Sequence, residues 1–208
     1  MRSALVAVIF AAPAQAHAQA QVTVGCQSVK LVLDEQVTVS ELNRLWVSGE
    51  LAPGVPAVLQ LHGCKGELLD SITLDAPLAR LDPAPLRGVR PSTVLVTVDL
   101  TAPAGSYSGP LTKPVQVEGN RLAYAQARAA DGMVQPILLA QTGKAAWKKV
   151  RVGAADQLLA VRSEPRDGDF TTNYRRYVHG KQGWTVRVRS QPGLWESDGE
   201  FPARRSFP

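Results

Sequence analysis

One stretch of the chain, Thr171-Thr-Asn-Tyr-Arg-Arg-Tyr-Val-His-Gly-Lys-Gln-Gly-Trp-Thr-Val-Arg-Val-Arg189, decides how this protein folds. Near its end the apolar residues Trp184, Val186 and Val188 alternate with polar ones, which is typical of a half-buried β-strand. Residues 179–183 hold two glycines and suit the loop of a β-hairpin. The stretch therefore predicts two antiparallel strands with one apolar face and one basic face.

The register of this hairpin decides which side chains share a face. If Val178 pairs with Trp184, the inner face carries the apolar residues together with Arg176, which is a poor position for a charge. Either the pairing is shifted or Arg176 reaches the edge of the sheet. The outer face then presents a cluster of candidate ligand-binding residues, namely Arg175, Tyr177, Arg187 and Arg189. In this register Arg175 lies directly opposite Arg187.

This basic face points to an anionic ligand. Like charges opposite each other in a strand pair repel unless an anion or solvent relieves them. Arginine offers a two-pronged donor for carboxylate, phosphate or sulfate groups, and Tyr177 would lie beside it as a stacking neighbour. The alternative is a solvated face whose arginines extend into water.

Strand patterns continue on both sides of the hairpin. The clearest is Val94-Leu-Val-Thr-Val-Asp-Leu100, which places Val94, Val96, Val98 and Leu100 on one face. Similar patterns predict further strands at residues 29–33, 36–40, 115–117, 122–128, 137–141, 147–152 and 158–162. Residues 121–130 are rich in alanine, so a short helix is the alternative there. The expected fold class is all-β.

The first half of the chain has features of a β-sandwich. Ala104-Gly-Ser-Tyr107 resembles the tyrosine corner of immunoglobulin-like (Ig-like) sandwiches, in which a phenol bonds back to a preceding backbone turn. Together with the short strands and a cysteine pair, this favours an Ig-like β-sandwich for residues 21–118. We expect residues 121–208 to form a second small antiparallel β module with an irregular, Pro-containing tail from Gln191 onward.

The two halves carry opposite charge. Residues 21–120 contain 7 Lys and Arg against 10 Asp and Glu, whereas residues 121–208 contain 15 against 8. This asymmetry indicates two modules with different surfaces and different partners. With 208 residues, of which 45% are hydrophobic, the chain suits one domain or two small ones, which excludes a disordered chain.

The first twenty residues have the pattern of a signal peptide. Arg2 is followed by the apolar run Ala4–Ala12, and Ala18-Gln19-Ala20 fits a cleavage site. The apolar run is too short to span a bilayer, which takes about 20 residues, and a buried helix of the fold is the alternative. We therefore expect residues 1–20 to be removed and the mature protein, which has no later transmembrane segment, to be periplasmic or secreted.

Two cysteines in an oxidising compartment suggest a disulfide. A bond between Cys26 and Cys64 would use both and stabilise the fold by about 4 kcal/mol on a chain-entropy estimate. The alternative is lipid modification of Cys26, because Thr23-Val24-Gly25-Cys26 resembles an acceptor site. That site lies far from the apolar run and would strand Cys64, so we favour the disulfide.

Catalytic and metal motifs are incomplete. His62-Gly-Cys64 lacks a second pair of ligands for a tetrahedral metal site, and residues 167–173 lack the glycine and glutamate of a calcium loop. Three carboxylates of the tail flank two aromatic residues as in a sugar subsite, although a solvated charge run is the simpler interpretation: Glu196, Asp198, Glu200, Trp195 and Phe201. We therefore expect no catalytic residue, metal or cofactor.

The leading hypothesis is an exported cell-envelope binding protein without catalytic activity. Its basic hairpin would contact an anionic glycan, a lipid head group or an acidic protein partner. One alternative is an envelope polysaccharide hydrolase that uses carboxylates of the second half, and another is a periplasmic assembly or chaperone-type protein with Ig-like domains. Nucleic acid is not expected, because the compartment is wrong and no binding motif accompanies the net charge of +5.

Overall fold

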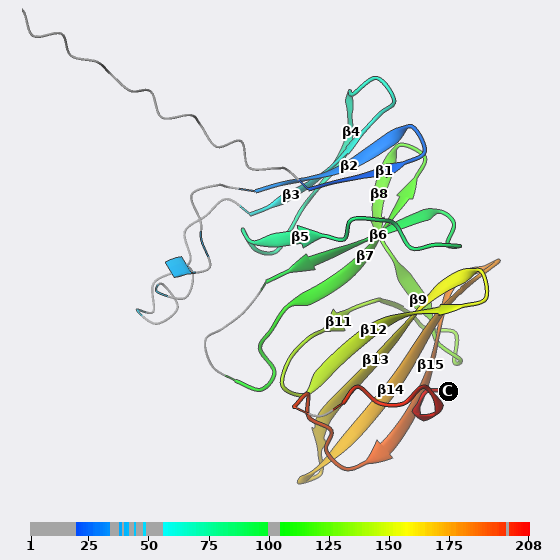
Figure 1. Cartoon of the computed structure of the whole chain (residues 1–208). Coiled ribbons are helices and arrows are strands. Elements are labelled where there is room, and N and C mark those ends of the chain that lie inside the picture. The colour runs from blue at the N-terminus through cyan, green and yellow to red at the C-terminus, as the bar shows by residue number, and fades with distance from the viewer. Residues whose placement is uncertain are drawn as a thin grey trace, which may run out of the picture.

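The computed structural model describes residues 20–33, 38, 40, 41, 44, 48, 56–99, 105–198 and 200–208. Nearly all of the expected signal peptide and most of the strand expected at residues 36–40 lie outside these ranges. Within them the named elements are β-strands and a short 3₁₀ helix, η1 (Arg204–Ser206), so the all-β prediction is confirmed (Figure 1). Four described residues between β2 and β3 are helical, namely Ser40, Glu41, Arg44 and Ser48, so residue 40 does not belong to the expected strand. No helix in the described ranges has the length and apolar character needed to cross a membrane.

The described strands form three sheets. Sheet A contains, in spatial order, β1 (Gln21–Val24), β2 (Gln27–Val32), β3 (Val58–His62) and β4 (Leu68–Thr73). Sheet B contains β11 (Leu139–Ala140), β7 (Leu111–Glu118), β6 (Ser92–Val98) and β5 (Ala79–Leu81), with β8 (Arg121–Tyr124) also paired to β7. Sheet C contains β10 (Val134–Pro136), β9 (Gln126–Arg128), β15 (Gly183–Pro192), β14 (Asp169–Gly180), β13 (Ala155–Arg166) and β12 (Ala145–Val152). The strand pairs are antiparallel, except that β15 pairs with β9 in parallel.

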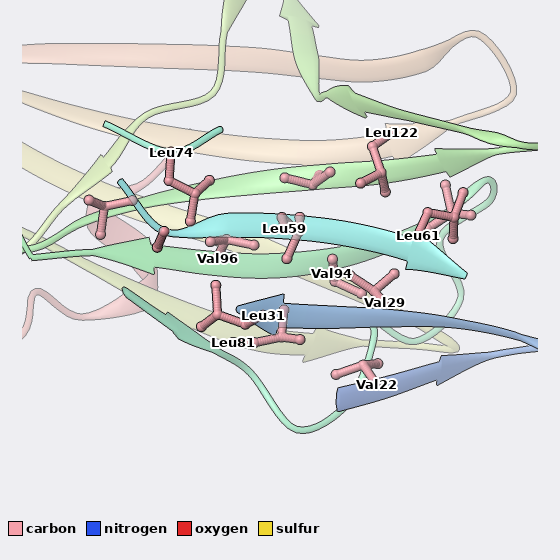
Figure 2. Close-up of a cluster of buried hydrophobic side chains, with 14 of the residues drawn as sticks. Val22, Val29, Leu31, Leu59, Leu61, Leu74, Leu81, Val94, Val96 and Leu122 are labelled. Atoms are coloured by element: carbon pink, nitrogen blue, oxygen red, sulfur yellow. The ribbon is translucent and has the colours of Figure 1, made fainter. Parts of the chain in front are cut away.

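The first core lies between sheet A and sheet B. Apolar side chains at alternate strand positions point into it, and Figure 2 shows them gathered in one cluster. The most deeply buried members, each at most 2% exposed, include Val29, Leu31, Leu59, Leu61, Val94, Val96 and Val115. Burial of such a side chain is worth roughly 1.5–3 kcal/mol, so this cluster holds the two sheets together.

Strand β6 is buried on both of its faces. Val94, Val96 and Val98 join the first core, as their alternation predicts, whereas Leu95 joins a second core between sheet B and sheet C. Leu100 lies outside the described residues. Sheet B is therefore the middle of three layers (Figure 1), and the unbroken apolar sequence of β6 suits a strand that is covered on both sides.

The second half of the chain contributes strands to this middle sheet. β8 and β11 both pair with β7, and Leu122 of β8 belongs to the first core. Leu86 and Val89, which precede β6, belong to the second core. A division into separate modules near residue 120 stays a prediction, but sheet B draws its strands from both sides of that boundary.

The alanine-rich residues 121–130 form β8 and β9 rather than the alternative helix. Between these strands the chain crosses from sheet B to sheet C, and Ala125 and Ala127 are buried there in the second core. Their small side chains let the two sheets approach at the crossing. Helix propensity is therefore overridden by tertiary packing at these positions.

Tyr107 does not hold the position expected from the tyrosine-corner motif. It is 45% exposed in the loop before β7, and the Lys144 ammonium lies 5.4 Å from its ring centroid. By contrast, Cys26 and Cys64 form the predicted disulfide, with their Cα atoms 4.9 Å apart. The bond joins the β1–β2 turn to the turn after β3, so it closes one end of sheet A.

The C-terminal tail crosses the outer face of sheet C, which is the face turned away from sheet B (Figure 1). The sequence predicts an irregular tail, and apart from η1 the described residues after β15 are irregular. They are nonetheless tied to the sheet, because the Thr172 hydroxyl contacts the carbonyl oxygen of Gly193 at 2.7 Å and the Trp195 amide donates to Ser163 at 2.8 Å. The tail is therefore held against sheet C by hydrogen bonds.

Candidate functional site

The structure shifts the register of the β14–β15 hairpin by one residue from the expected one. Gly180 pairs with Gly183, so His179 rather than Val178 lies opposite Trp184. The loop between them is Lys181-Gln182, and Gly183 has a left-handed φ of 92°. A tight turn that ends in a left-handed glycine is a common way to close a hairpin.

This shift separates the four candidate ligand-binding residues, so the prediction that they form one cluster is wrong. Arg175 and Tyr177 lie on the inner face of sheet C, which is turned toward sheet B. Arg187 and Arg189 lie on the outer face. The physical reason is burial, because the observed register places Tyr177 and Trp184 together in the second core, where they are 4% and 2% exposed.

Arg176 lies on the outer face, so the difficulty of placing its charge inside disappears. Its Nε donates to Gln157 Oε1 at 2.9 Å, and its Nη1 donates to the carbonyl oxygen of Pro208 at 3.2 Å. Beside it, the Tyr174 ring packs edge-on against Phe207 of the tail with centroids 5.6 Å apart. The outer face of β14 is thus occupied by the chain itself.

Arg189 also binds the tail rather than facing open solvent with a free guanidinium. Its Nη1 donates to the carbonyl oxygens of Arg205 at 3.0 Å and Ser206 at 3.3 Å. Arg187, two residues earlier on β15, is exposed. Of the two predicted ligand-binding residues on the outer face, Arg189 therefore bonds to the tail, while both side chains stay exposed.

The inner face of sheet C offers a second arrangement of arginines. β13 and β14 have 12 residues each, whereas β6 and β7 of sheet B have 7 and 8. Next to the second core, near the edge of sheet B, this face carries Arg162 and Arg175. These two are diagonal neighbours, because Arg175 pairs with Ala160, which precedes Arg162 by two positions on β13.

Arg162 and Arg175 line a hollow of about 190 Å³ between the two sheets. Its other walls are mainly apolar and include Leu111, Leu138 and Ala140. A second hollow of about 250 Å³ adjoins the first, and the two share the lining residues Leu111, Ala140, Ala145 and Arg162. We call the two hollows together the arginine groove.

Tyr107 and Thr142 form part of the second hollow. Near it the Lys144 ammonium lies over two aromatic rings, at 5.4 Å from the Tyr107 centroid and 4.1 Å from that of Phe170. Such cation–π contacts fix a lysine at low cost in hydration. Lys144 therefore adds a positive charge beside Tyr107, at one end of the arginine groove.

The charge of the arginine groove is incompletely neutralised. The Arg162 Nε lies 3.1 Å from Glu164 Oε1, in an ion pair that is about half exposed. No carboxylate in the described part of the chain forms an ion pair with Arg175. The neighbour of Arg175 on the same strand face is Tyr177. Burial raises the pKa of the Tyr177 phenol, and the Arg175 guanidinium opposes this rise. The phenol therefore stays neutral and does not balance the charge of Arg175.

The remaining sequence candidates lie elsewhere. His62 ends β3, with its Nδ1 3.0 Å from the Gly66 carbonyl oxygen and its Nε2 3.1 Å from Gln60 Oε1, so both ring nitrogens have partners. The described residues contain no group of three or more His, Cys, Asp or Glu placed to hold a metal ion. Three exposed carboxylates of the tail do not line the arginine groove: Glu196, Asp198 and Glu200.

Comparison of the chain with protein-family models, with curated proteins and with solved structures found no match. The site is therefore argued from its own geometry. Arg162 and Leu138 are residues of the groove that the sequence did not single out. A signal for Arg162 was present, because it follows Leu158 and Ala160 at alternate positions and breaks the apolar pattern of that face.

Proposed function

We propose that this chain is an exported binding protein of the cell envelope whose arginine groove holds an anionic amphiphile. The ligand combines a carboxylate, phosphate or sulfate group with a hydrocarbon segment. The observation that carries the proposal is the presence of two arginines and several apolar side chains around one hollow of about 190 Å³. The proposal keeps the anionic ligand of the leading hypothesis but places its binding site on the inner face of the hairpin instead of the outer face.

The two parts of such a ligand would be bound by different forces. Arg175 can donate a pair of charge-assisted hydrogen bonds, which are worth about 1.5–3 kcal/mol each when they are shielded from water. Leu138 is 46% exposed and, with Leu111 and Ala140, offers apolar surface that a hydrocarbon segment would cover. Covering that surface contributes about 25 cal/mol per Å².

Three parts of the proposal rest mainly on the sequence. Residues 1–20 act as a signal peptide, and the mature protein is periplasmic or secreted. The sandwich of residues 21–118 is Ig-like, a proposal that the packing of sheet A on sheet B and the Cys26–Cys64 disulfide support. The hydrolase and the assembly protein remain alternative predictions.

Calorimetric titration of the mature chain with decanoate tests the proposal. Decanoate joins one carboxylate to a linear hydrocarbon, and 1-decanol is its uncharged counterpart. We expect decanoate to bind at least tenfold more tightly than 1-decanol, and Arg175→Gln to weaken decanoate about tenfold, since one charge-assisted contact is worth about 1.4 kcal/mol or more.

Arg187→Gln is the matched control, because Arg187 lies on β15 with its side chain on the opposite face. This variant should bind decanoate as the unmodified chain does. Equal affinity for decanoate in the Arg175 variant, or equal affinity for decanoate and 1-decanol, would show that the groove does not recognise an anionic group.

A further inference from the structure

A separate pocket of about 220 Å³ lies where the C-terminal tail meets β12. Three aromatic residues line it, namely Trp147 of β12 and Trp195 and Phe201 of the tail. Three polar residues complete its wall: Gln141, Lys148 and Ser197. We call it the tryptophan pocket, and its lining has one residue, Ala146, in common with the arginine groove.

Hydrogen bonds and stacking fix the tail side of the tryptophan pocket. The Trp195 amide donates to the buried Ser163 hydroxyl at 2.8 Å, and the Ser197 amide donates to a carbonyl oxygen in the turn before β12 at 2.9 Å. Phe201 stacks on Phe207 with centroids 5.6 Å apart and an interplanar angle of 10°. The aromatic walls are therefore held in place before any ligand arrives, which lowers the entropic cost of binding.

We propose that the tryptophan pocket binds a pyranose ring of a glycan. A pyranose presents C–H groups on its faces, which the electron-rich face of an indole attracts, and hydroxyl groups around its edge. The Gln141 amide and the Ser197 hydroxyl supply both donors and acceptors for those hydroxyls, and the Lys148 ammonium supplies donors. The pocket thus matches both surfaces of a sugar ring.

A hydrocarbon ligand fits this pocket poorly. It would cover the polar groups of Gln141, Lys148 and Ser197 without bonding to them, and burying an unpaired polar group costs roughly 1–3 kcal/mol. The tryptophan pocket is therefore chemically distinct from the arginine groove, and the proposal stands whether or not the groove binds an amphiphile. Lys148 further favours a ring that bears a carboxylate over a neutral one.

Two-dimensional NMR of the isotope-labelled mature chain tests the proposal. The chain has four tryptophans, so the indole N–H signals can be assigned by replacing each tryptophan with phenylalanine. The probes are cellotetraose and chitotetraose, which are neutral, and tetragalacturonate, which is acidic. We expect the Trp147 and Trp195 signals to shift in a saturable way with at least one probe, while the signal of the buried Trp184 stays in place.

Trp195→Ala should weaken the responding probe about tenfold, because it removes one aromatic stacking surface. Leu194→Ala is the matched control, since Leu194 is 46% exposed beside Trp195 but does not line the pocket. Trp147→Ala gives an independent test from the sheet side. Because Trp147 also packs against the second core, the dispersed backbone amide signals rather than Trp184 show that each variant is folded. The proposal is overturned if no probe shifts the Trp147 and Trp195 signals, or if Trp195→Ala and Trp147→Ala both bind as tightly as Leu194→Ala.

Discussion

Replacement of Ser163 by alanine should loosen the C-terminal tail from sheet C. Ser163 lies in β13 with its side chain on the outer face, and its exposed fraction is 0%. Its Oγ lies 2.7 Å from Thr172 Oγ1, 3.0 Å from the Trp195 carbonyl oxygen and 2.8 Å from the Trp195 amide nitrogen. Thr172 Oγ1 in turn lies 2.7 Å from the carbonyl oxygen of Gly193.

Counting hydrogens limits how these groups can be bonded. Each hydroxyl has one hydrogen, so the two hydroxyls cannot donate to both tail carbonyls and also to each other. Ser163 accepts a hydrogen bond from the Trp195 amide and donates its own hydrogen either to the Trp195 carbonyl oxygen or to Thr172, and Thr172 can donate to Gly193 in both arrangements. In either arrangement Ser163 accepts one hydrogen bond and donates another.

Ser163→Ala therefore breaks two buried hydrogen bonds at once. It leaves the Trp195 amide without its acceptor and removes the bond that the Ser163 hydroxyl donates, and a typical buried bond contributes about 1 kcal/mol. We expect the free energy of unfolding to fall by about 2 kcal/mol, which urea denaturation followed by circular dichroism measures. A double-mutant cycle with Thr172→Val should give a coupling energy of about 0.5–3 kcal/mol.

Ser190→Ala is the control for this experiment. Ser190 lies in β15 and donates to Asn173 Oδ1 at 2.7 Å, but this bond is exposed to solvent. Its loss should change stability by at most about 0.5 kcal/mol. The reasoning fails if Ser163→Ala costs no more than Ser190→Ala, because the tail would then not depend on the buried chain of hydroxyls.

Three other changes test other parts of the fold. Replacing Cys26 and Cys64 by serine should lower the free energy of unfolding by about 4 kcal/mol, since the bond links residues 38 apart in sequence, and a loss below about 1 kcal/mol in urea would contradict this. Gly183→Ala should lower the free energy of unfolding by about 1–2 kcal/mol, because φ of Gly183 is 92°. Gly180→Ala is the control and should be neutral or slightly stabilising, because Gly180 has open space around it and no left-handed φ. Equal melting temperatures of the two variants would disprove the observed turn. Burial lowers the pKa of His179 below its ordinary value of about 6.5, so the unfolded chain binds the proton first and stability falls as the pH drops from about 7 to about 5. His179→Phe should flatten this decline, and an unchanged slope would show that His179 does not cause it.

The sequence was most informative where the signal was local. Alternation placed Val94, Val96 and Val98 on one face, because side chains of a strand point to opposite sides at every step. The disulfide was predictable, because the pairing of two cysteines leaves no alternative partner. Both inferences need no knowledge of which sheets pack together.

The sequence was misleading where one residue of register decided the outcome. A shift by one position moves every side chain to the other face of a strand. The local pattern predicted a loop of residues 179–183, but the two-residue loop Lys181-Gln182 lets Tyr177 and Trp184 enter the second core together. The gain from burying those rings depends on sheet B, which no local pattern of the hairpin reveals.

The tail was predictable in its irregularity but not in its position. Trp195 contacts Ser163 across 32 residues of sequence, and Phe207 contacts Tyr174 across a similar span. Such pairings follow from the path of the chain over sheet C and leave no periodic signal. The sequence pointed to Trp195 and Phe201 as a sugar subsite, but the contribution of Trp147 from β12 to the tryptophan pocket left no local signal.

The excess length of β13 and β14 over sheet B links the two proposed sites. On the inner face of β14, Tyr177 is 4% exposed and belongs to the second core, whereas Arg175, two residues earlier, lines the arginine groove. The second core requires no strand beyond this level, yet β14 continues for several residues toward Asp169. On its outer face this extension carries Thr172, which holds the tail, while on its inner face it borders the arginine groove. A shorter hairpin would keep the second core but would lose Thr172 and Arg175, so the extension supports the walls of both proposed sites.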